Sequence, residues 1–367
     1  MVQSLTDIYI YPIKSTKGIQ LPQAFVEERG LENDRRYMLV DVEGEFITGR
    51  THPQLTQVSI EFSKKGLFVS APNQPSFYIQ PTQFTDETIT VNIWSDTVQA
   101  QHCDPEYDRW FSTFLKQKCQ LVYLPDSSVR CVKNKQTQVS FADGYPLLLI
   151  NQASVDQLNS RLDTPVSALH FRPNLLIKGD FPFVEDSWER IKIGEVEFEV
   201  SKPCSRCTFT NVDPKTGIAD LQQPLKTLAQ FRYNQGDIDF GQNLIPLNQG
   251  IIRSGDEIQV LAAKSAPFYR SMLESEESDR KALQIHFAGA DIKVTGDNQQ
   301  LLLDQAELAG INIPYSCRGG KCGRCKTKLL AGEVNVLNDQ GLFKEELEAG
   351  YILACSCIPL SNISIDY

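Results

Sequence analysis

Long hydrophobic runs and basic charge are both scarce in this sequence of 367 residues. No stretch approaches the roughly 18 consecutive apolar residues of a membrane-spanning helix, which argues against a membrane protein. Acidic residues outnumber basic ones by 46 to 36, and the net charge is −10. Because nucleic-acid binding requires a basic face, a general nucleic-acid binder is disfavoured. The chain starts directly with a strand pattern and shows no basic leader, so we expect a cytoplasmic protein.

Histidine is also scarce, with four residues at positions 52, 102, 170 and 286. None stands at a ligand spacing from another, so the sequence gives little support for histidine acid/base catalysis. His170, beside the segment FRPN, is the one histidine to test. The ten cysteines do not suggest a disulfide scaffold, because the chain is long and shows no export signal. Seven lie in or beside tight clusters, which favours metal or redox chemistry: Cys204, Cys207, Cys317, Cys322, Cys325, Cys355 and Cys357.

Short strands dominate the pattern up to residue 264. Alternating runs between residues 5 and 101, with turn signals every 8 to 12 residues, predict a small β-barrel. Asp104 and Pro105 then mark the start of an amphipathic helix. Buried strands at PLLLI and NLLIKG, a helix across residues 155 to 162 and a hairpin at ERIKIGEVEFEV predict a second β-barrel-like domain.

The last part of the chain has a different pattern. Residues 265–282 are rich in serine and charge, as expected for a linker. Residues 283–367 combine a strand pair, a helix ending at Gly310, a cysteine-bearing loop and two closing strands. The fold class is therefore mainly β, with a small α+β domain at the C-terminal end. The predicted division is 1–101, 102–264, the linker 265–282, and 283–367.

Cys317, Cys322 and Cys325 form a C-x4-C-x2-C motif, and Cys355 follows 30 residues later. This is the spacing of plant-type 2Fe-2S proteins, in which four thiolates hold two irons. Glycines in the loop allow the backbone to curl over the cluster. A zinc site is the alternative, although zinc more often pairs C-x2-C with a second such motif or two histidines. Cys357 competes with Cys355 as the fourth ligand; on a strand the two would face opposite sides, and we favour Cys355.

Residues 283–367 resemble a β-grasp 2Fe-2S ferredoxin domain. The resemblance implies one-electron transfer at a potential on the order of −400 mV. The loop is locally cationic, which indicates either a solvated face or a docking surface for an acidic flavin domain of an NAD(P)H-dependent reductase. The five cations of this predicted basic rim are Arg318, Lys321, Arg324, Lys326 and Lys328.

A second cysteine pair, Cys204 and Cys207, has C-x2-C spacing after a strand. By itself the pair is compatible with zinc, a redox dithiol or a buried turn. A thioredoxin-like motif would need a βαβ context, which is missing. A soft metal bound through one thiolate remains open.

The segments YPIKS, FRPNLLI with EDSW, and CSRCTFTNVDPKTG occur in the order typical of a MOSC domain preceded by its N-terminal β-barrel. With the ferredoxin part included, the chain resembles the YcbX-type MOSC proteins and, over residues 1 to about 262, the amidoxime-reducing component family. This resemblance implies a molybdenum cofactor, in which a pyranopterin dithiolene and one protein thiolate hold the metal.

The resemblance also implies roles for individual residues. Cys207 is the expected molybdenum ligand, and Cys204 is either structural or a neighbour of the metal site that does not bind the metal itself. The neighbours expected to line the metal site are Ser205, Arg206 and Thr208. The residues expected to hold the pterin and its phosphate are Lys14, Ser15, Arg35, Arg50, Arg172 and Asn174, with Asp143 nearby. Arginine suits a buried phosphate because its planar guanidinium group can donate two parallel hydrogen bonds to the phosphate oxygens. Cys103, Cys119 and Cys131 match no motif and are interpreted as ordinary thiols.

The function implied is the reduction of N-hydroxylated compounds, such as hydroxylaminopurine-type base analogues, with electrons relayed from the 2Fe-2S cluster to molybdenum. A sulfur carrier with a persulfide on Cys207, or a cofactor-handling protein, is the alternative. The ferredoxin part argues against both, because persulfide transfer and cofactor delivery need no electron relay.

Overall fold

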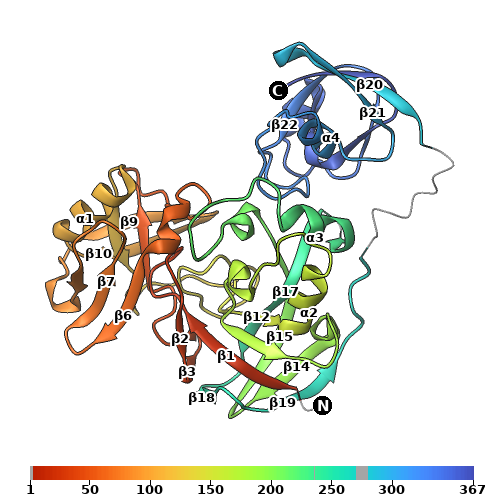
Figure 1. Cartoon of the computed structure of the whole chain (residues 1–367). Coiled ribbons are helices and arrows are strands. Elements are labelled where there is room, and N and C mark those ends of the chain that lie inside the picture. Colours follow the sequence, from red (N-terminus) through yellow and green to blue (C-terminus); the bar gives the residue numbers. More distant parts are fainter. Residues whose placement is uncertain (1–2, 235, 270–279) are drawn as a thin grey trace. The chain divides into compact units, whose positions relative to one another are not determined.

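The structure is a computed structural model that describes residues 3–234, 236–269 and 280–367 (Figure 1). The chain forms two compact units. The first contains the chain up to Cys204, together with Phe209–Leu221 and Gly241–Ala266. The second contains Ser205–Thr208, Gln222–Phe240 and Pro267–Tyr367. Residues 270–279 of the predicted linker lie outside the described residues.

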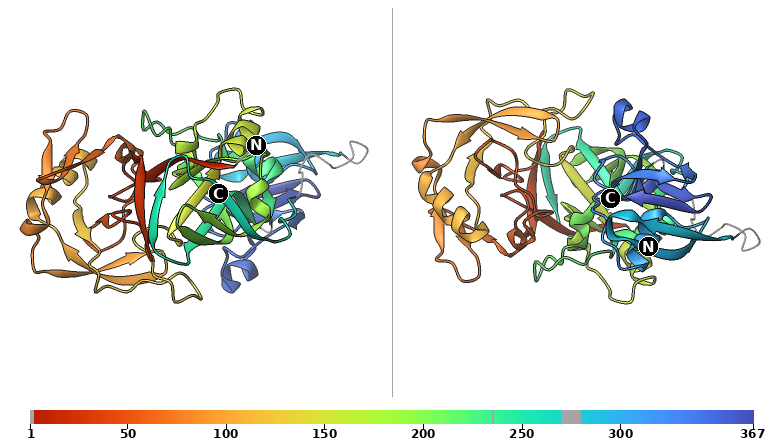
Figure 2. Two further views of the ribbon diagram at one scale, coloured as in Figure 1. Left: turned by 90° about the horizontal axis from the view of Figure 1, so that it is seen from below. Right: turned by 90° about the horizontal axis from the view of Figure 1, so that it is seen from above.

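The first barrel is formed by two antiparallel sheets, which Figure 2 shows from below and from above. One sheet has the order β5-β11-β10-β9 and the other the order β6-β7-β8. Their strands are β5 (Tyr37–Val40), β6 (Ser59–Ser63), β7 (Gly66–Ser70), β8 (Phe77–Ile79), β9 (Thr88–Ile93), β10 (Asp96–His102) and β11 (Gln120–Tyr123).

Helix α1 (Pro105–Leu115) packs its aromatic face into the core of this barrel. Asp104 accepts a hydrogen bond from the backbone N–H of Glu106, as the predicted N-cap requires. Trp110 and Phe111 are buried against the strands. The predicted helix and its start are therefore confirmed.

The second barrel of the first unit is built around a long sheet with the order β19-β14-β15-β17-β12-β13-β1-β2, beside a small sheet β18-β3-β4. The strands are β1 (Ser4–Ile10), β2 (Ile19–Leu21), β3 (Gln23–Glu27), β4 (Gly30–Leu31), β12 (Leu147–Asn151), β13 (Leu175–Lys178), β14 (Trp188–Ile193), β15 (Val196–Ser205), β17 (Asp237–Pro246), β18 (Gly250–Arg253) and β19 (Ile258–Ala263). The N-terminal strand β1 thus pairs with β13, far along the sequence.

Helix α2 (Gln152–Asn159) is shorter than the sequence predicts. Val155 and Leu158 are buried as expected, but Leu162 lies beyond the helix end. The Asn159 side chain closes a loop by donating to the carbonyl of Val166 (2.9 Å) and accepting from its N–H (2.8 Å). This local alternative to helix explains the early end.

The second unit contains the predicted α+β domain. Its mixed sheet has the order β21-β20-β26-β22-β24, and β20 and β26 run parallel. The elements are β20 (Ala282–Phe287), β21 (Ile292–Asp297), α4 (Leu302–Leu308), β22 (Lys326–Ala331), β23 (Val334–Val336), α5 (Lys344–Glu348), β24 (Tyr351–Leu353), β25 (Cys357–Pro359) and β26 (Ile363–Asp366). The same unit contains α3 (Leu225–Phe231) and β16 (Tyr233–Asn234), which the sequence analysis did not predict. The mainly β fold class is confirmed, whereas the domain boundaries stay a prediction.

Candidate cofactor sites

Four cysteines of the C-terminal domain come together in the second unit. The sulfur atoms of Cys325 and Cys355 are 3.1 Å apart, and both residues are buried. The thiol of Cys317 interacts with those of Cys322 and Cys355, and these contacts hold the pKa of Cys317 well below its usual range. The same contacts raise the pKa of the Cys322 and Cys355 thiols.

The number of thiols suits a 2Fe-2S cluster. Each iron of such a cluster takes two protein ligands, so two irons need four. Cys317, Cys322, Cys325 and Cys355 supply four thiols, and the donor set therefore fits the predicted cluster.

The loop that carries these thiols is shaped by close backbone contacts. The N–H groups of Gly319 and Lys321 both point at the sulfur of Cys317, at 3.4 Å. Gly320 has φ +77°, and a Cβ there would lie 2.6 Å from the carbonyl oxygen of Asn338. Glycine is therefore required at position 320, and the backbone supplies hydrogen bonds to sulfur as predicted.

The fourth-ligand prediction needs a different reason from the one given by the sequence. Cys355 lies in a single 3-10 turn, Ala354–Ser356, and not on a strand. Cys357 begins β25, which pairs with β23, and burial raises the pKa of its thiol to about 12. The contact between Cys355 and Cys325, and not an alternation of strand faces, distinguishes the two thiols.

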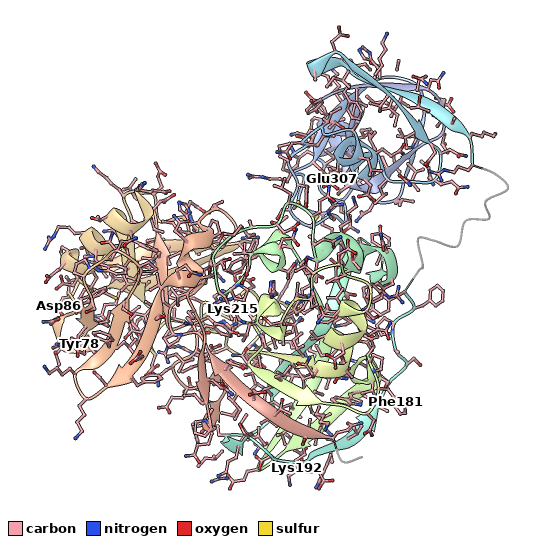
Figure 3. The ribbon with its side chains drawn as sticks, in the orientation of Figure 1. Tyr78, Asp86, Phe181, Lys192, Lys215 and Glu307 are labelled. Carbon is pink, nitrogen blue, oxygen red and sulfur yellow. The ribbon has the colours of Figure 1, made fainter. Side chains whose placement is uncertain are left out.

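The predicted basic rim is largely neutralised. Arg318 is buried and pairs with Asp304 (2.6 Å) and with Glu307, which Figure 3 labels. Lys321 pairs with Asp237, and Lys326 pairs with Glu346. Of the five cations, Arg324 and Lys328 stay exposed, and in the described residues neither has an acidic partner within ion-pair distance. Three of the five predicted cations are therefore ion-paired within the second unit, and the docking role of the rim stays a prediction.

The first unit brings together most of the residues predicted to hold the pterin. Arg35 donates to the Asn174 side chain at 2.9 Å, and the guanidinium groups of Arg35 and Arg172 lie 4.5 and 4.1 Å from the centre of the Tyr11 ring. Burial, and then the neighbouring Arg35, lower the pKa of Arg172 to about 10, although Tyr11 acts in the opposite direction. Ser15, in the same segment as Tyr11, is buried and has φ +72°.

One polar atom in this cluster lacks a partner. The Nη2 atom of Arg172 is buried, and no atom of the described residues hydrogen-bonds to it. An unpaired buried guanidinium nitrogen beside a second guanidinium is costly unless an anion satisfies it. The cluster therefore fits the phosphate of a pterin cofactor, which Arg35 and Arg172 would hold.

Lys14 and Asp143 form the other edge of the cluster. Nζ of Lys14 donates to the carbonyl of Phe141 at 2.8 Å and pairs with the Asp143 carboxylate. Burial lowers the pKa of Lys14 to about 8, although Asp143 raises it. The Asp143 side chain is 70% exposed and also accepts from Nε1 of Trp94 at 3.4 Å. Arg50 lies 4.2 Å from the centre of the Trp94 ring.

Arg130 supports the edge of the cluster, and the sequence analysis missed it. Its guanidinium donates to the carbonyls of Ser140 and Ala142 (2.6 Å each) and of Asp143 (3.0 Å), and to the carboxylate of Asp96 (2.8 Å). It therefore fixes the segment that carries Asp143. Nothing in its surroundings, SSVRCV, signals this role.

The segment with Cys207 belongs to the second unit and is held by backbone contacts. Arg206 donates from its N–H to the carbonyl of Ile238 (2.7 Å) and from Nε to that of Phe240 (2.8 Å). The N–H of Thr208 donates to the carbonyl of Ser316 at 2.9 Å. Ser316 precedes Cys317, so one hydrogen bond joins the neighbours of the two predicted metal ligands.

The hydrogen bonds and burial of the other residues named in the sequence analysis are as follows. The hydroxyl of Ser205 lies 3.5 Å from the carboxylate of Asp239. His170 bonds to Ser167, and burial lowers the pKa of its ring. Cys103 and Cys119 are buried thiols, Cys204 is half-buried, and Cys131 is exposed. No disulfide joins any of the ten cysteines.

Comparison with known proteins accounts for almost the whole chain. Models for the MOSC N-terminal beta barrel domain, the MOSC domain and the 2Fe-2S iron-sulfur cluster binding domain match residues 2–118, 136–259 and 285–360. Mitochondrial amidoxime-reducing component 1 from Mus musculus is 34% identical over 282 residues, which cover 71% of this chain and 83% of the relative. Its counterpart from Homo sapiens is 30% identical with the same coverage. Among solved structures, the ferredoxin reductase in carbazole 1,9a-dioxygenase is 36% identical, covers 24% of this chain and 29% of that chain, and has a TM-score of 0.23.

Among the described residues we find no helix with the length and apolar character needed to cross a bilayer.

Proposed function

Since the chain belongs to the family of the mitochondrial amidoxime-reducing components, we propose that it is a molybdenum-cofactor-dependent reductase of N-hydroxylated compounds that supplies the electrons through its own 2Fe-2S domain. The reaction is R–NH–OH + 2 e⁻ + 2 H⁺ → R–NH₂ + H₂O. Hydroxylaminopurine-type base analogues are the proposed substrates. The bound cofactor supplies a metal that can store both electrons before the N–O bond breaks.

One observation carries this proposal: the hydrogen bond between Thr208 and Ser316. It supports a short route from the cluster ligand Cys317 to the proposed molybdenum ligand Cys207, through two peptide groups and one hydrogen bond. A sulfur carrier or a cofactor-delivery protein would have no use for such a connection.

The chain's own residues have distinct tasks in this reaction. Arg35 and Arg172 hold the cofactor's phosphate, and Lys14 is a third cation at the same cluster. Arg206 holds the Cys207 segment through the Phe240 carbonyl and acts as a positioning residue beside the proposed metal site.

We also propose a flavoprotein reductase as the electron donor. Cys322 is the exposed thiol of the cluster, and Arg324 is exposed beside it. Because Arg318, Lys321 and Lys326 of the predicted rim are ion-paired, the donor's contact is expected to centre on Cys322 and Arg324, with Lys328 as the other unpaired cation. A reducing compartment, the cytoplasm in our proposal, is consistent with ten cysteines that form no disulfide.

Replacing Cys207 tests the proposal, with Cys204→Ser, the other cysteine of the C-x2-C pair, as the matched control. Cys207→Ser is expected to abolish anaerobic reduction of a hydroxylaminopurine with an artificial donor and to leave the 2Fe-2S absorption unchanged. Metal analysis of the wild-type protein should give about two irons and one molybdenum per chain. Full activity of Cys207→Ser, or iron without molybdenum in an active protein, would contradict the assignment and favour a sulfur carrier.

A further inference from the structure

A half-exposed tryptophan stands at the edge of the proposed cofactor cluster. Trp94 is the first residue of the two-residue turn that joins β9 to β10, because Ile93 and Asp96 are paired on either side. Its backbone has φ +57°, and 48% of the residue is exposed. Turns of this kind ordinarily place glycine, asparagine or aspartate in the left-handed region.

This backbone conformation is costly for a large aromatic residue. A bulky side chain at positive φ is an outlier, and such strain is concentrated at functional sites. Packing does not explain the choice, since half of the ring faces solvent. The other two tryptophans of the chain, Trp110 and Trp188, are buried at 9% and 2% exposure.

The residues that Trp94 contacts belong to the cofactor cluster or pack against it. The guanidinium of Arg50 lies over its ring at 4.2 Å, the ring of Phe46 lies 5.2 Å away, and Nε1 donates to Asp143 at 3.4 Å. Arg130 ties Asp96, in the same turn, to the backbone of Asp143. The ring is therefore held in place while part of it stays open.

The backbone beside Arg50 packs against an aromatic ring of the same unit. A Cβ on Gly49, the preceding residue, would lie 2.2 Å from the ring of Phe209, so the backbone at Gly49 rests on that ring. Phe209 follows the proposed molybdenum ligand Cys207 by two residues in the sequence. Arg50 thus adjoins, through Gly49, a residue that is close in sequence to that ligand.

We propose that Trp94 is the surface on which a planar, aromatic N-hydroxylated substrate stacks, with Arg50 supporting the ring and the exposed carboxylate of Asp143 accepting an N–H of the heterocycle. Trp94 then selects aromatic N-hydroxylated compounds over aliphatic ones. This inference rests on the proposed reductase function and assigns its specificity residue. Stacking tolerates different bases because each has a π-face.

Two variants of Trp94 and one control test the proposal in the holoenzyme. Trp94→Asn removes the ring and relieves the backbone, whereas Trp94→Phe keeps an aromatic surface. Phe181→Asn is the control, since Phe181 is a 70% exposed aromatic of the same unit, labelled in Figure 3, that has no part in the cluster. For 6-hydroxylaminopurine, Trp94→Asn should lower kcat/KM by about 10-fold or more, and Trp94→Phe by less. For N-methylhydroxylamine, all three variants should stay within about twofold of wild type, because an aliphatic substrate has no ring to stack.

Fluorescence gives a second readout that needs no turnover. Adenine, which cannot be reduced at nitrogen, should quench the emission of the exposed Trp94 in wild type and in Phe181→Asn. Trp94→Asn should lose both this quenching and competitive inhibition by adenine, and Trp94→Phe should keep the inhibition.

Equal losses for the aromatic and the aliphatic substrate in Trp94→Asn would overturn the proposal. A loss of bound molybdenum confined to the Trp94 variants would also overturn it, because the ring would then hold the cofactor. If wild type reduces neither compound but adenine still quenches Trp94, the reductase assignment fails while stacking stands.

Discussion

The close approach of Gly319 to Gly236 offers the sharpest test of how the cluster loop is held in the second unit. A Cβ on Gly319 would lie 1.6 Å from the carbonyl oxygen of Gly236, and the other atoms near it also belong to residues 236 and 237. Gly319 is not among the residues with positive φ. Gly319→Ala therefore leaves the ferredoxin domain itself unstrained and obstructs one contact.

The expected effect follows from the distance. Ordinary contact begins at 3.4 Å, so the two backbones must separate by about 1.8 Å, the difference between 3.4 and 1.6. The hydrogen bond from Thr208 to Ser316 (2.9 Å), which joins the ferredoxin domain to the Cys207 segment, does not survive this movement. Overpacking of this kind costs about 1–3 kcal/mol, which lowers the equilibrium constant for the contact by about 5- to 150-fold.

Stopped-flow absorbance measures the result. The cluster is reduced first, an N-hydroxylated substrate is added, and reoxidation of the cluster is followed. Gly319→Ala should slow reoxidation without changing the cluster's spectrum, and Gly289→Ala, whose nearest neighbour is a side-chain oxygen at 3.3 Å, should leave the rate unchanged. If the cluster of Gly319→Ala is reoxidised at the wild-type rate, the reasoning is refuted, because electron transfer from the cluster would then not depend on this contact.

Three further predictions concern single residues. Cys355→Ser should remove the 2Fe-2S absorption, whereas Cys357→Ser should keep it, and the opposite result would exchange the ligand assignment. Arg172→Met should stabilise the cofactor-free chain by about 1–3 kcal/mol in urea unfolding, because an unpaired buried nitrogen is removed, yet lower its molybdenum content; the phosphate role fails if the metal content is unchanged. The pKa of Lys14 is lowered by burial from 10.5 to about 8, so the unfolded chain binds the proton more tightly and stability must rise between these two pH values. The gain is about 3 kcal/mol; urea midpoints of the cofactor-free chain should show it in wild type and not in Lys14→Met.

The sequence predicted best where the signal is local. The start of α1 depends on Asp104 and Pro105, which are adjacent to it, and the four cluster thiols follow from their spacing. Helix α2 ended early because the Asn159 side chain offers the backbone a loop, a competition that hydrophobic spacing does not detect.

Charge pairing was predicted least well. Lys321 stands in a cationic run, but its partner Asp237 lies 84 residues away, and that distance is bridged only in the folded chain. Arg130 has no motif around it, and its four partners are mostly backbone carbonyls, which every residue has. Ion pairs and carbonyl clamps depend on tertiary contacts, and the identity of the residues does not reveal them.

The pairing of β1 with β13 has a consequence for how the protein folds while it is synthesised on the ribosome. Thr6 of β1 donates to the carbonyl of Leu176, which lies 170 residues later in the sequence. The paired strands β3 and β18 are separated by an even longer stretch of sequence. At about 5–20 residues per second, β1 and its near neighbour β2 emerge roughly 10–30 s before the other partner of β1, β13, exists. The first barrel, residues 37–123, can close during this interval, while β1 still lacks β13. The second barrel, whose first strand is synthesised earliest, is therefore completed after the first barrel has had time to fold.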